Sequence, residues 1–227
     1  MKNLSKSLSC LCVITLLVAV CAGFTVKVNA TDNLSLGFIP YGSSTIKYYN
    51  EDGEYKLTYK KMLGGNIAYE YTSSKSCLGF LAELSFAMAK LDSINLNKNI
   101  YLYEEDDISD FEMRRILTNK DFNKNFKSFG GAIYLGCTIF PKQRFQLPIY
   151  VGAACDYVMA DPVKNVAISA VGKVRMKFYP TYKVGIYAGA SYKLGILTGG
   201  DKPYYDGKTH GNKFNGFNID AGIIFSF

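Results

Sequence analysis

The most constraining feature of this sequence is a period of two in its hydrophobic residues, clearest in residues 166–178. Alternate positions of that segment hold apolar side chains, namely Val166, Ile168, Ala170, Val174, Met176 and Phe178. The positions between them include Ser169, Lys173, Arg175 and Lys177. This alternation predicts a β-strand with two chemically different faces. Its apolar face must pack against another sheet in a soluble protein, or against lipid in a membrane barrel.

The same alternation recurs along the chain. The expected strands are residues 34–38, 63–71, 78–88, 127–140, 148–159, 166–178, 184–196 and 217–227. We therefore predict an all-β fold, a closed antiparallel up-and-down transmembrane β-barrel of eight strands. An even strand number returns both chain ends to the same side of the membrane.

The predicted connections alternate in length, which is a second signal for a membrane barrel. Residues 73–76, 141–146 and 180–182 form short connections, residues 41–61, 91–126 and 198–213 form long ones, and residues 160–165 are the exception. Short periplasmic turns and long outer loops are typical of outer-membrane barrels. Ten strands remain an alternative, because residues 45–59 also alternate around residues 51–54. That hairpin could equally extend the first two strands above the membrane.

The N-terminus has the pattern of a cleaved signal peptide. Lys2 and Lys6 precede an apolar run over residues 8–24, and Val28 and Ala30 are small residues at the positions that signal peptidase reads. We therefore assign residues 1–30 to the signal peptide and residues 31–227 to the barrel. A lipidated start at Cys21 is the disfavoured alternative, because the preceding valine is bulky.

Charge composition argues against nucleic-acid binding. The formal net charge is +7, but Lys2, Lys6 and Lys27 belong to the signal peptide, which leaves an excess of four positive charges. No basic helix or basic patch interleaved with aromatic residues accompanies this excess.

Three cysteines, Cys77, Cys137 and Cys155, lie beyond the signal peptide. An odd number cannot form a closed disulfide framework, so we expect small apolar fillers. Cys137 and Cys155 fall on neighbouring predicted strands, and both face outward. The predicted hairpin register places them about two residues apart and not directly opposite each other.

Outward-facing aromatic residues are expected to form two girdles at the membrane surfaces. The predicted periplasmic girdle is Tyr69, Tyr71, Phe178, Phe225 and Phe227, and the outer girdle is Phe38, Phe86, Tyr157, Tyr192 and Phe217.

The last strand carries a motif. Asp220, Gly222, Phe225 and the terminal Phe227 resemble the C-terminal signal by which outer-membrane barrels are recognised during assembly. With the strand count and loop pattern, residues 31–227 are similar to the small eight-stranded OmpA-like and opacity-type barrels. This resemblance implies a monomer in the bacterial outer membrane, with membrane lipid and the barrel assembly machinery as partners.

Eight charged residues are predicted to face the lumen: Glu70, Glu83, Asp156, Lys173, Arg175, Lys177, Lys193 and Asp220. In one interpretation they form a salt-bridged plug, with Lys173 and Arg175 pairing with Asp156 or Glu83. In the other, Lys173, Arg175 and Lys177 form a ladder that favours anions in a small channel.

We expect no catalytic, metal or cofactor site. The single histidine, His210, lies in a loop rich in glycine and lysine, and the acidic residues 104–107 lack the spaced oxygens and glycine of a calcium loop. The connection over residues 91–126 is the most distinctive surface feature, with a capping box at residues 109–112 that predicts a short helix.

The sequence thus favours a structural or adhesin-like surface protein that binds an extracellular or host ligand through residues 91–126. A small porin is the alternative, and a soluble ligand-binding barrel is disfavoured because charged residues oppose the large apolar ones.

Overall fold

The computed structural model describes residues 30–50, 53–73, 76–97, 125–141, 143–160, 163–198, 204–205, 208–209 and 212–227. Eight long strands form the barrel: β1 (Ala30–Asn50), β2 (Gly53–Ser73), β3 (Leu78–Asn97), β4 (Asn125–Ile139), β5 (Phe145–Ala160), β6 (Val163–Phe178), β7 (Val184–Thr198) and β10 (Lys213–Ser226). Two short strands, β8 (Tyr204–Tyr205) and β9 (Lys208–Thr209), pair with each other.

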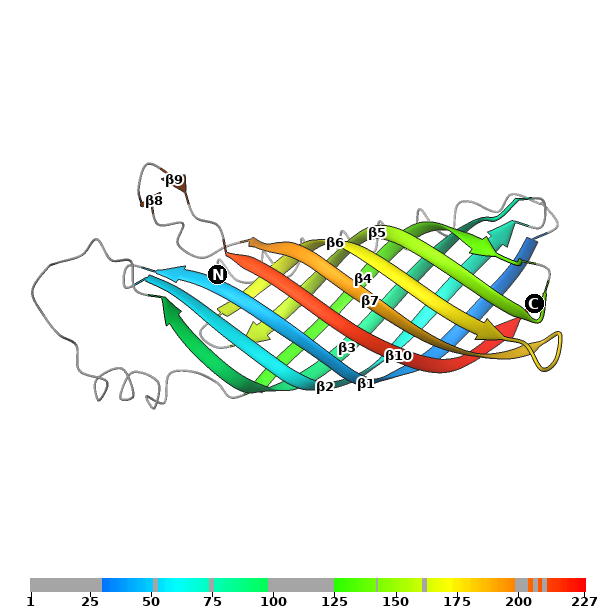
Figure 1. Ribbon diagram of the computed structural model, residues 1–227, viewed down its shortest axis with the longest axis horizontal. Helices are drawn as coiled ribbons and strands as arrows, with labels where there is room; N and C mark the ends of the chain where they lie inside the picture. Colours follow the sequence, from blue (N-terminus) through cyan, green and yellow to red (C-terminus); the bar gives the residue numbers. More distant parts are fainter. Residues whose placement is uncertain are drawn as a thin grey trace, which may run out of the picture.

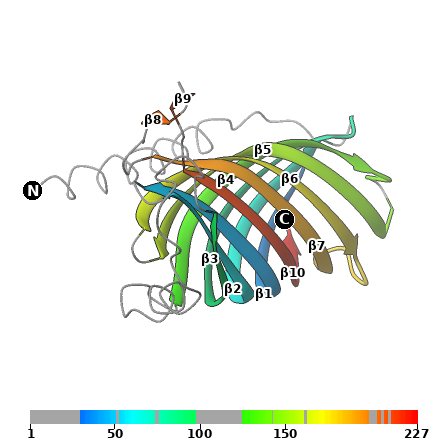
Figure 2. The same cartoon turned by 60° about the vertical axis from the view of Figure 1, so that its left-hand side comes forward.

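The strands close into one antiparallel barrel in the order β1-β10-β7-β6-β5-β4-β3-β2 (Figures 1 and 2). Closure joins the first strand to the last: Leu34 pairs with Phe225, and the backbone N–H of Phe227 donates to the carbonyl of Asp32 at 2.9 Å. A closed barrel leaves no unpaired edge. The predicted all-β fold and its eight strands are confirmed.

The prediction of a long connection over residues 41–61 is wrong. β1 and β2 stay paired from Ala30–Ser73 up to Asn50–Gly53, so this segment is a tight hairpin. Its alternating residues turn Ile46 and Leu57 inward, where both are fully buried. β3 likewise runs on to Asn97, beyond the predicted start of the next connection at residue 91. β1, β2 and β3 therefore extend past the barrel body. This agrees with the alternative in which residues 45–59 extend the first two strands, and the ten-strand alternative is wrong.

Two irregularities in β1 and β2 mark where the extension begins. The β1–β10 register shifts between Phe38 and Tyr41, and the β2–β3 register shifts between Lys60 and Leu63. Lys61 has a positive φ of 55° and is exposed. A bulge bends a strand and re-aims its side chains. Here it leaves both Lys60 and Lys61 exposed.

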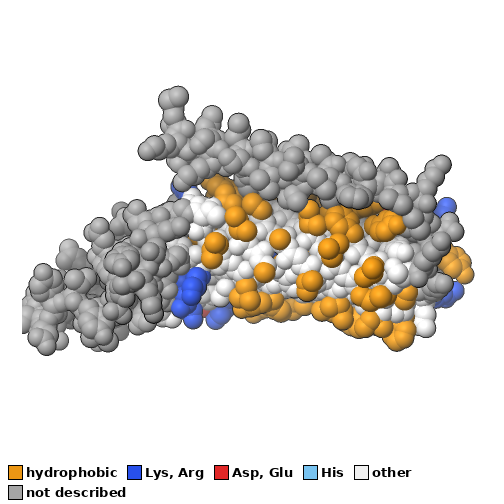
Figure 3. Space-filling model, turned by 90° about the horizontal axis from the view of Figure 1, so that it is seen from above, with side chains coloured by type: hydrophobic (Ala, Val, Ile, Leu, Met, Phe, Trp, Pro, Cys, Tyr) orange, Lys and Arg blue, Asp and Glu red, His pale blue; other side chains and the backbone are white. Residues whose placement is uncertain are grey.

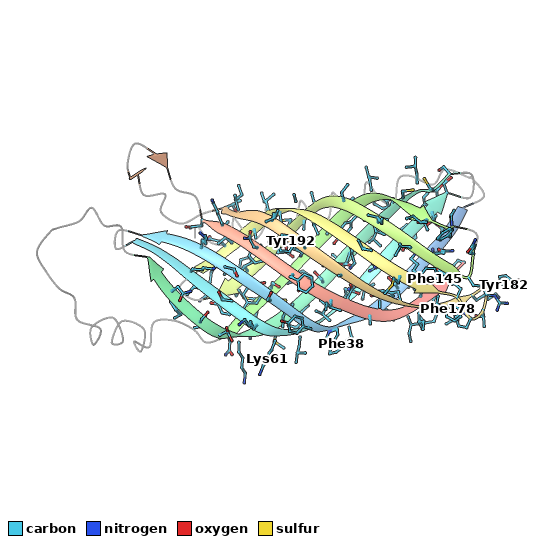
Figure 4. The ribbon with its side chains drawn as sticks, in the orientation of Figure 1. Phe38, Lys61, Phe145, Phe178, Tyr182 and Tyr192 are labelled. Carbon is cyan, nitrogen blue, oxygen red and sulfur yellow. The ribbon has the colours of Figure 1, made fainter. Side chains whose placement is uncertain are left out.

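The barrel is inside out relative to a soluble protein. Large apolar side chains cover its outer face (Figure 3), including Leu135 at 66% and Val151 at 68% exposure, while charged residues such as Arg175 are fully buried. Figure 4 shows Phe38 and Tyr192 outside the wall, with Phe145, Phe178 and Tyr182 toward the end of the barrel that holds the C-terminus.

Several predicted features lie outside the described residues: the signal peptide apart from Ala30, the acidic residues 104–107, the capping box at residues 109–112 and His210. Among the residues that are described, no helix is long and apolar enough to cross a membrane.

Candidate functional site: the filled lumen

The side chains that fill the lumen form the candidate site. We call Glu70, Glu83, Asp156, Lys173, Arg175, Lys177, Lys193 and Asp220 the lumen charge network. All eight are buried, with side chains turned inward from six strands, because each lies on the polar face of an alternating strand. Four are acidic and four are basic, so their formal charges cancel.

Lys173 and Arg175 form the centre of this network. Lys173 Nζ donates to Glu83 Oε2 at 2.5 Å and to Asp220 Oδ2 at 2.9 Å. Arg175 Nη2 donates to the same Glu83 oxygen at 3.0 Å and lies 3.6 Å from Asp220 Oδ2. Each carboxylate is therefore shared by two cations from neighbouring inward positions of β6. Asp220 also accepts a hydrogen bond from Asn66 Nδ2 at 2.9 Å.

The pair of Lys177 with Glu70 spans the full width of the barrel. Lys177 Nζ donates to Glu70 Oε1, and Thr72 Oγ1 donates to the same oxygen at 3.2 Å. Lys177 lies on β6 and Glu70 on β2, which are four places apart in a ring of eight strands. They are therefore on opposite walls, and their contact bridges the lumen.

Lys193 and Asp156 make a separate pair nearer the extended strands. Lys193 Nζ donates to both carboxylate oxygens of Asp156 at 2.8 Å. The expected partnership of Lys173 and Arg175 with Glu83 is present, whereas Asp156 pairs with Lys193 from β7. The register of a single hairpin could not show this, because β5 and β7 are not paired with each other but flank β6, and the two side chains meet over the inner face of β6.

A second layer, which we call the apolar seal, was not predicted. It is a cluster of buried residues to which every barrel strand contributes: Ile46, Leu57, Tyr59, Met62, Ala87, Ala89, Phe126, Val158, Ala160, Ala167, Leu197 and Phe214. The rings of Tyr59 and Phe126 lie 5.1 Å apart between centroids. The alternation of residues 45–59 could have indicated this layer, because it places Ile46, Leu57 and Tyr59 on the inward face. That segment was instead assigned to a long connection. The lumen is thus charged toward one end and apolar toward the other.

Comparison with known proteins agrees with this architecture. No protein-family model matches the sequence, and no curated protein sequence is significantly similar to it. Among solved structures, OprG from Pseudomonas aeruginosa aligns with a TM-score of 0.53 and 9% identity, over 87% of this chain and 95% of that one. The chain has the fold of a small outer-membrane barrel.

Two further structures align at lower TM-scores. A major outer membrane protein from Thermus thermophilus aligns with a TM-score of 0.48 and 11% identity, covering 87% of this chain and 99% of that one. Ail, the attachment invasion locus protein of Yersinia pestis, aligns with a TM-score of 0.43 and 15% identity, covering 86% and 99%. At these identities the likeness concerns the fold.

A hollow of about 300 Å³ lies at the end of the lumen near the C-terminus. Its lining includes Thr72, Arg144, Tyr179 and Ser226. Thr72 also donates to Glu70, so the Glu70–Lys177 pair lies next to the hollow on its inner side. Burial and the nearby carboxylate of Glu70 raise the pKa of the Tyr179 phenol above its ordinary value, so that side chain stays neutral.

The residues of the C-terminal motif occupy different surroundings. Asp220 is part of the lumen charge network, and Gly222 pairs with Gly37 beneath the Tyr187 ring. A Cβ added to Gly222 would lie 2.1 Å from the Leu36 carbonyl oxygen, 2.7 Å from Gly37 Cα and 2.8 Å from Tyr187 Cε1, so the backbone of β1 and the Tyr187 ring leave no room for a side chain there. Phe225 and Phe227 point outward and are 37% and 79% exposed.

The three described cysteines are free thiols. Cys137 pairs with Ile149 and Cys155 with Gly131, so these two cysteines are six residues apart in register, not two as predicted. Cys137 instead lies close to Cys77: its strand partner is Leu78, and the backbone N–H of Thr138 donates to the Cys77 carbonyl at 2.6 Å.

No group of three or more His, Cys, Asp or Glu that could hold a metal ion is present among the described residues.

Proposed function

We propose that this protein is a closed outer-membrane barrel that serves as a rigid anchor and presents its long connections to the exterior. The observation that carries this proposal is the Lys177–Glu70 pair between opposite walls of the lumen. A conducting pore needs a continuous polar path. The lumen charge network cancels its own charge, and the apolar seal lies between it and the extended strands.

Side-chain packing supports a closed lumen independently of charge. Eight-stranded barrels have an interior just wide enough for side chains to fill. Tyr59, Phe126, Phe214 and Leu57 occupy that width in the apolar seal, each at most 3% exposed. Water would lose hydrogen bonds in crossing such a layer.

Single-channel recording in a planar bilayer tests the closed lumen. The wild-type barrel is expected to give no stable conductance steps. A variant that removes both layers, with Tyr59 and Phe126 changed to Gly and Glu70 and Lys177 changed to Ser, is expected to give steps and shows that the assay can detect an open lumen. Stable steps from the wild-type protein would reject the anchor in favour of a small channel.

The exterior role rests on the shape of one end of the barrel. β1, β2 and β3 contain 21, 21 and 20 residues, against 14 to 16 in the other barrel strands, so they project on the side away from the C-terminus. β3 ends and β4 begins on that side. A connection held by a rigid barrel is a common place for binding function. Our proposal is that residues 91–126 contact an extracellular ligand.

An epitope inserted between residues 105 and 106 tests this orientation. Intact cells should bind an antibody against it, whereas the same epitope inserted between Lys142 and Gln143 should be reached only after the outer membrane is permeabilised. The reverse result would contradict the orientation.

The C-terminal strand is proposed to act as the assembly signal through Asp220, Gly222, Phe225 and Phe227. A regular final strand can pair with the edge of a partner sheet by β-augmentation. Deleting Phe227, or changing Phe225 to Asp, should block membrane assembly in cells. Normal heat-modifiable gel mobility of these variants would contradict this role, and Ile219→Val on the same outer face is the matched control.

A further inference from the structure

The outer surface of the barrel carries a concentration of lysines at the end away from the C-terminus. We call the following set the lysine belt: Lys47, Lys56, Lys60, Lys61, Lys90, Lys127, Lys164 and Lys213. They come from β1, β2, β3, β4, β6 and β10, and all lie at outward positions of their strands. Figure 3 shows blue side chains gathered where the apolar face ends.

The height of the belt follows the edge of the apolar surface. On β3 the last outward apolar residue, Met88, is followed two positions later by Lys90. On β4 Lys127 stands two positions beyond Phe129, and on β6 Lys164 stands two positions beyond Val166. Two residues along a strand are about 6.6 Å, less on a tilted strand. In a membrane this places the ammonium groups directly above the hydrocarbon, at the level of lipid headgroups.

The lysines also face one another across strands. Lys47 pairs with Lys213 of β10 and with Lys56 of β2, which makes a row of three over adjacent strands. Lys60 pairs with Lys90 of β3. Like charges directly opposite in a sheet repel and destabilise it. Anions from the surroundings that lie between these side chains would reduce the repulsion.

The described acidic side chains offset only a small part of this charge. Four of them belong to the lumen charge network, and Asp32 lies at the opposite end of the barrel, beside the C-terminus. Asp92 neighbours the belt, and its Oδ2 lies 2.8 Å from Lys60 Nζ. Five lysines of the belt make no ion pair with a described acidic side chain, so among the described residues their positive charge is not offset: Lys56, Lys61, Lys90, Lys127 and Lys213.

The opposite edge of the apolar surface has a different composition. Phe140, Phe145, Phe178 and Tyr182 are exposed there, between 46% and 92%. The described basic side chains on that side are Arg144 and Lys183, both in turns. The two edges of the barrel are thus built for two chemically different membrane surfaces.

We propose that the lysine belt is a binding surface for the phosphate groups of lipid headgroups in the outer leaflet. Lysine is a compact point charge that suits phosphate oxygens, and eight of them would match a densely anionic leaflet. A lipid is favoured over a soluble polyanion because the belt lies immediately beside the apolar surface. This inference rests on the membrane location proposed above.

The test uses the full-length protein refolded into two kinds of vesicle, phosphatidylcholine alone and phosphatidylcholine with phosphatidic acid. The readout is the midpoint temperature at which the folded gel band is lost. Phosphatidic acid is expected to raise the wild-type midpoint, and high salt should abolish the rise by screening. A variant with Lys61, Lys90, Lys127 and Lys164 changed to Gln should fold in phosphatidylcholine and lose the rise.

Two controls make the result specific. Changing the same four lysines to Arg should preserve the rise, and changing Arg144 and Lys183 to Gln at the other edge should not remove it. A wild-type barrel that folds in both vesicles with equal midpoints would overturn the belt proposal while leaving the closed anchor intact. Failure to insert into either vesicle would instead count against the membrane location. Heparin binding through these lysines without a lipid effect would assign the belt to a soluble polyanion and overturn the lipid proposal.

Discussion

The guanidinium of Arg175 lies over the ring of Tyr187, with its Cζ 4.4 Å from the ring centroid. The Tyr187 hydroxyl donates to Asn66 at 2.9 Å, and Asn66 donates in turn to Asp220. Arg175 also bonds Glu83, so the stack of Arg175 on Tyr187 joins the charged pairs to a hydrogen-bonded chain from β7 to β2 and β10. The centre of the barrel is one connected polar assembly.

Replacing Arg175 by Ala should be strongly destabilising. The change leaves Glu83 and Asp220 buried with Lys173 as their common cation, and breaking a buried pair costs about 3–5 kcal/mol. Tyr187→Phe keeps the ring and loses one hydrogen bond, so a loss of about 1 kcal/mol is expected. Urea unfolding of both variants in lipid vesicles measures the two values. Equal small losses would show that Arg175 is not the centre of the network.

Gly222 should not tolerate a side chain. Its missing Cβ leaves room for the backbone of β1 at Leu36 and Gly37 and for the Tyr187 ring, so Gly222→Ala is expected to slow folding and lower the free energy of unfolding. Gly172→Ala is the matched control, because a Cβ there meets nothing within 4 Å and replaces glycine in a strand. We expect the control to fold at least as well as the wild type. If both variants behave alike, close packing against β1 and Tyr187 is not the reason for glycine at position 222.

The Lys60–Asp92 ion pair should make a pH-dependent contribution to stability. Its hydrogen bond and charge attraction raise the pKa of Lys60 above its ordinary 10.5. Because the folded pKa is the higher one, the pair's contribution is complete below the unfolded pKa and is lost as pH rises through the folded pKa. The effect is therefore confined to strongly alkaline solution. NMR titration of Lys60 should show its pKa falling in Asp92→Asn, and an unchanged value would contradict the pairing.

Mild oxidation should join Cys77 to Cys137. Cys77 directly precedes Leu78, the strand partner of Cys137, so the two cysteines are one register position apart at the end of β4, whereas Cys155 lies six register positions from Cys137. Copper-phenanthroline treatment of the folded barrel, followed by non-reducing peptide mapping, should yield a Cys77–Cys137 disulfide and free Cys155. Cys137→Ser is the control that should abolish the product. A Cys137–Cys155 disulfide would contradict the observed register.

Much of the architecture was accessible from alternation alone. A period of two assigns each side chain of residues 166–178 to one face, so the inward charges of β6 and the outward apolar positions follow from position in the chain. The terminal strand could likewise be recognised from its own residues. The hairpin of β1 and β2 was predicted only as an alternative, because the bulge at Lys61 separates its alternation from that of residues 63–71.

Pairing across the lumen was decided only by the tertiary structure. Lys177 and Glu70 are 107 residues apart, and their contact depends on how closure and strand stagger align opposite walls. The curvature of the closed sheet likewise brings Lys193 of β7 onto Asp156 of β5, from the two strands that flank β6, and it forms the apolar seal, to which all eight barrel strands contribute. Local sequence determined which face each residue occupies, because the strand period is local. The closed barrel determined which residues meet, because that depends on the position of every strand around the ring.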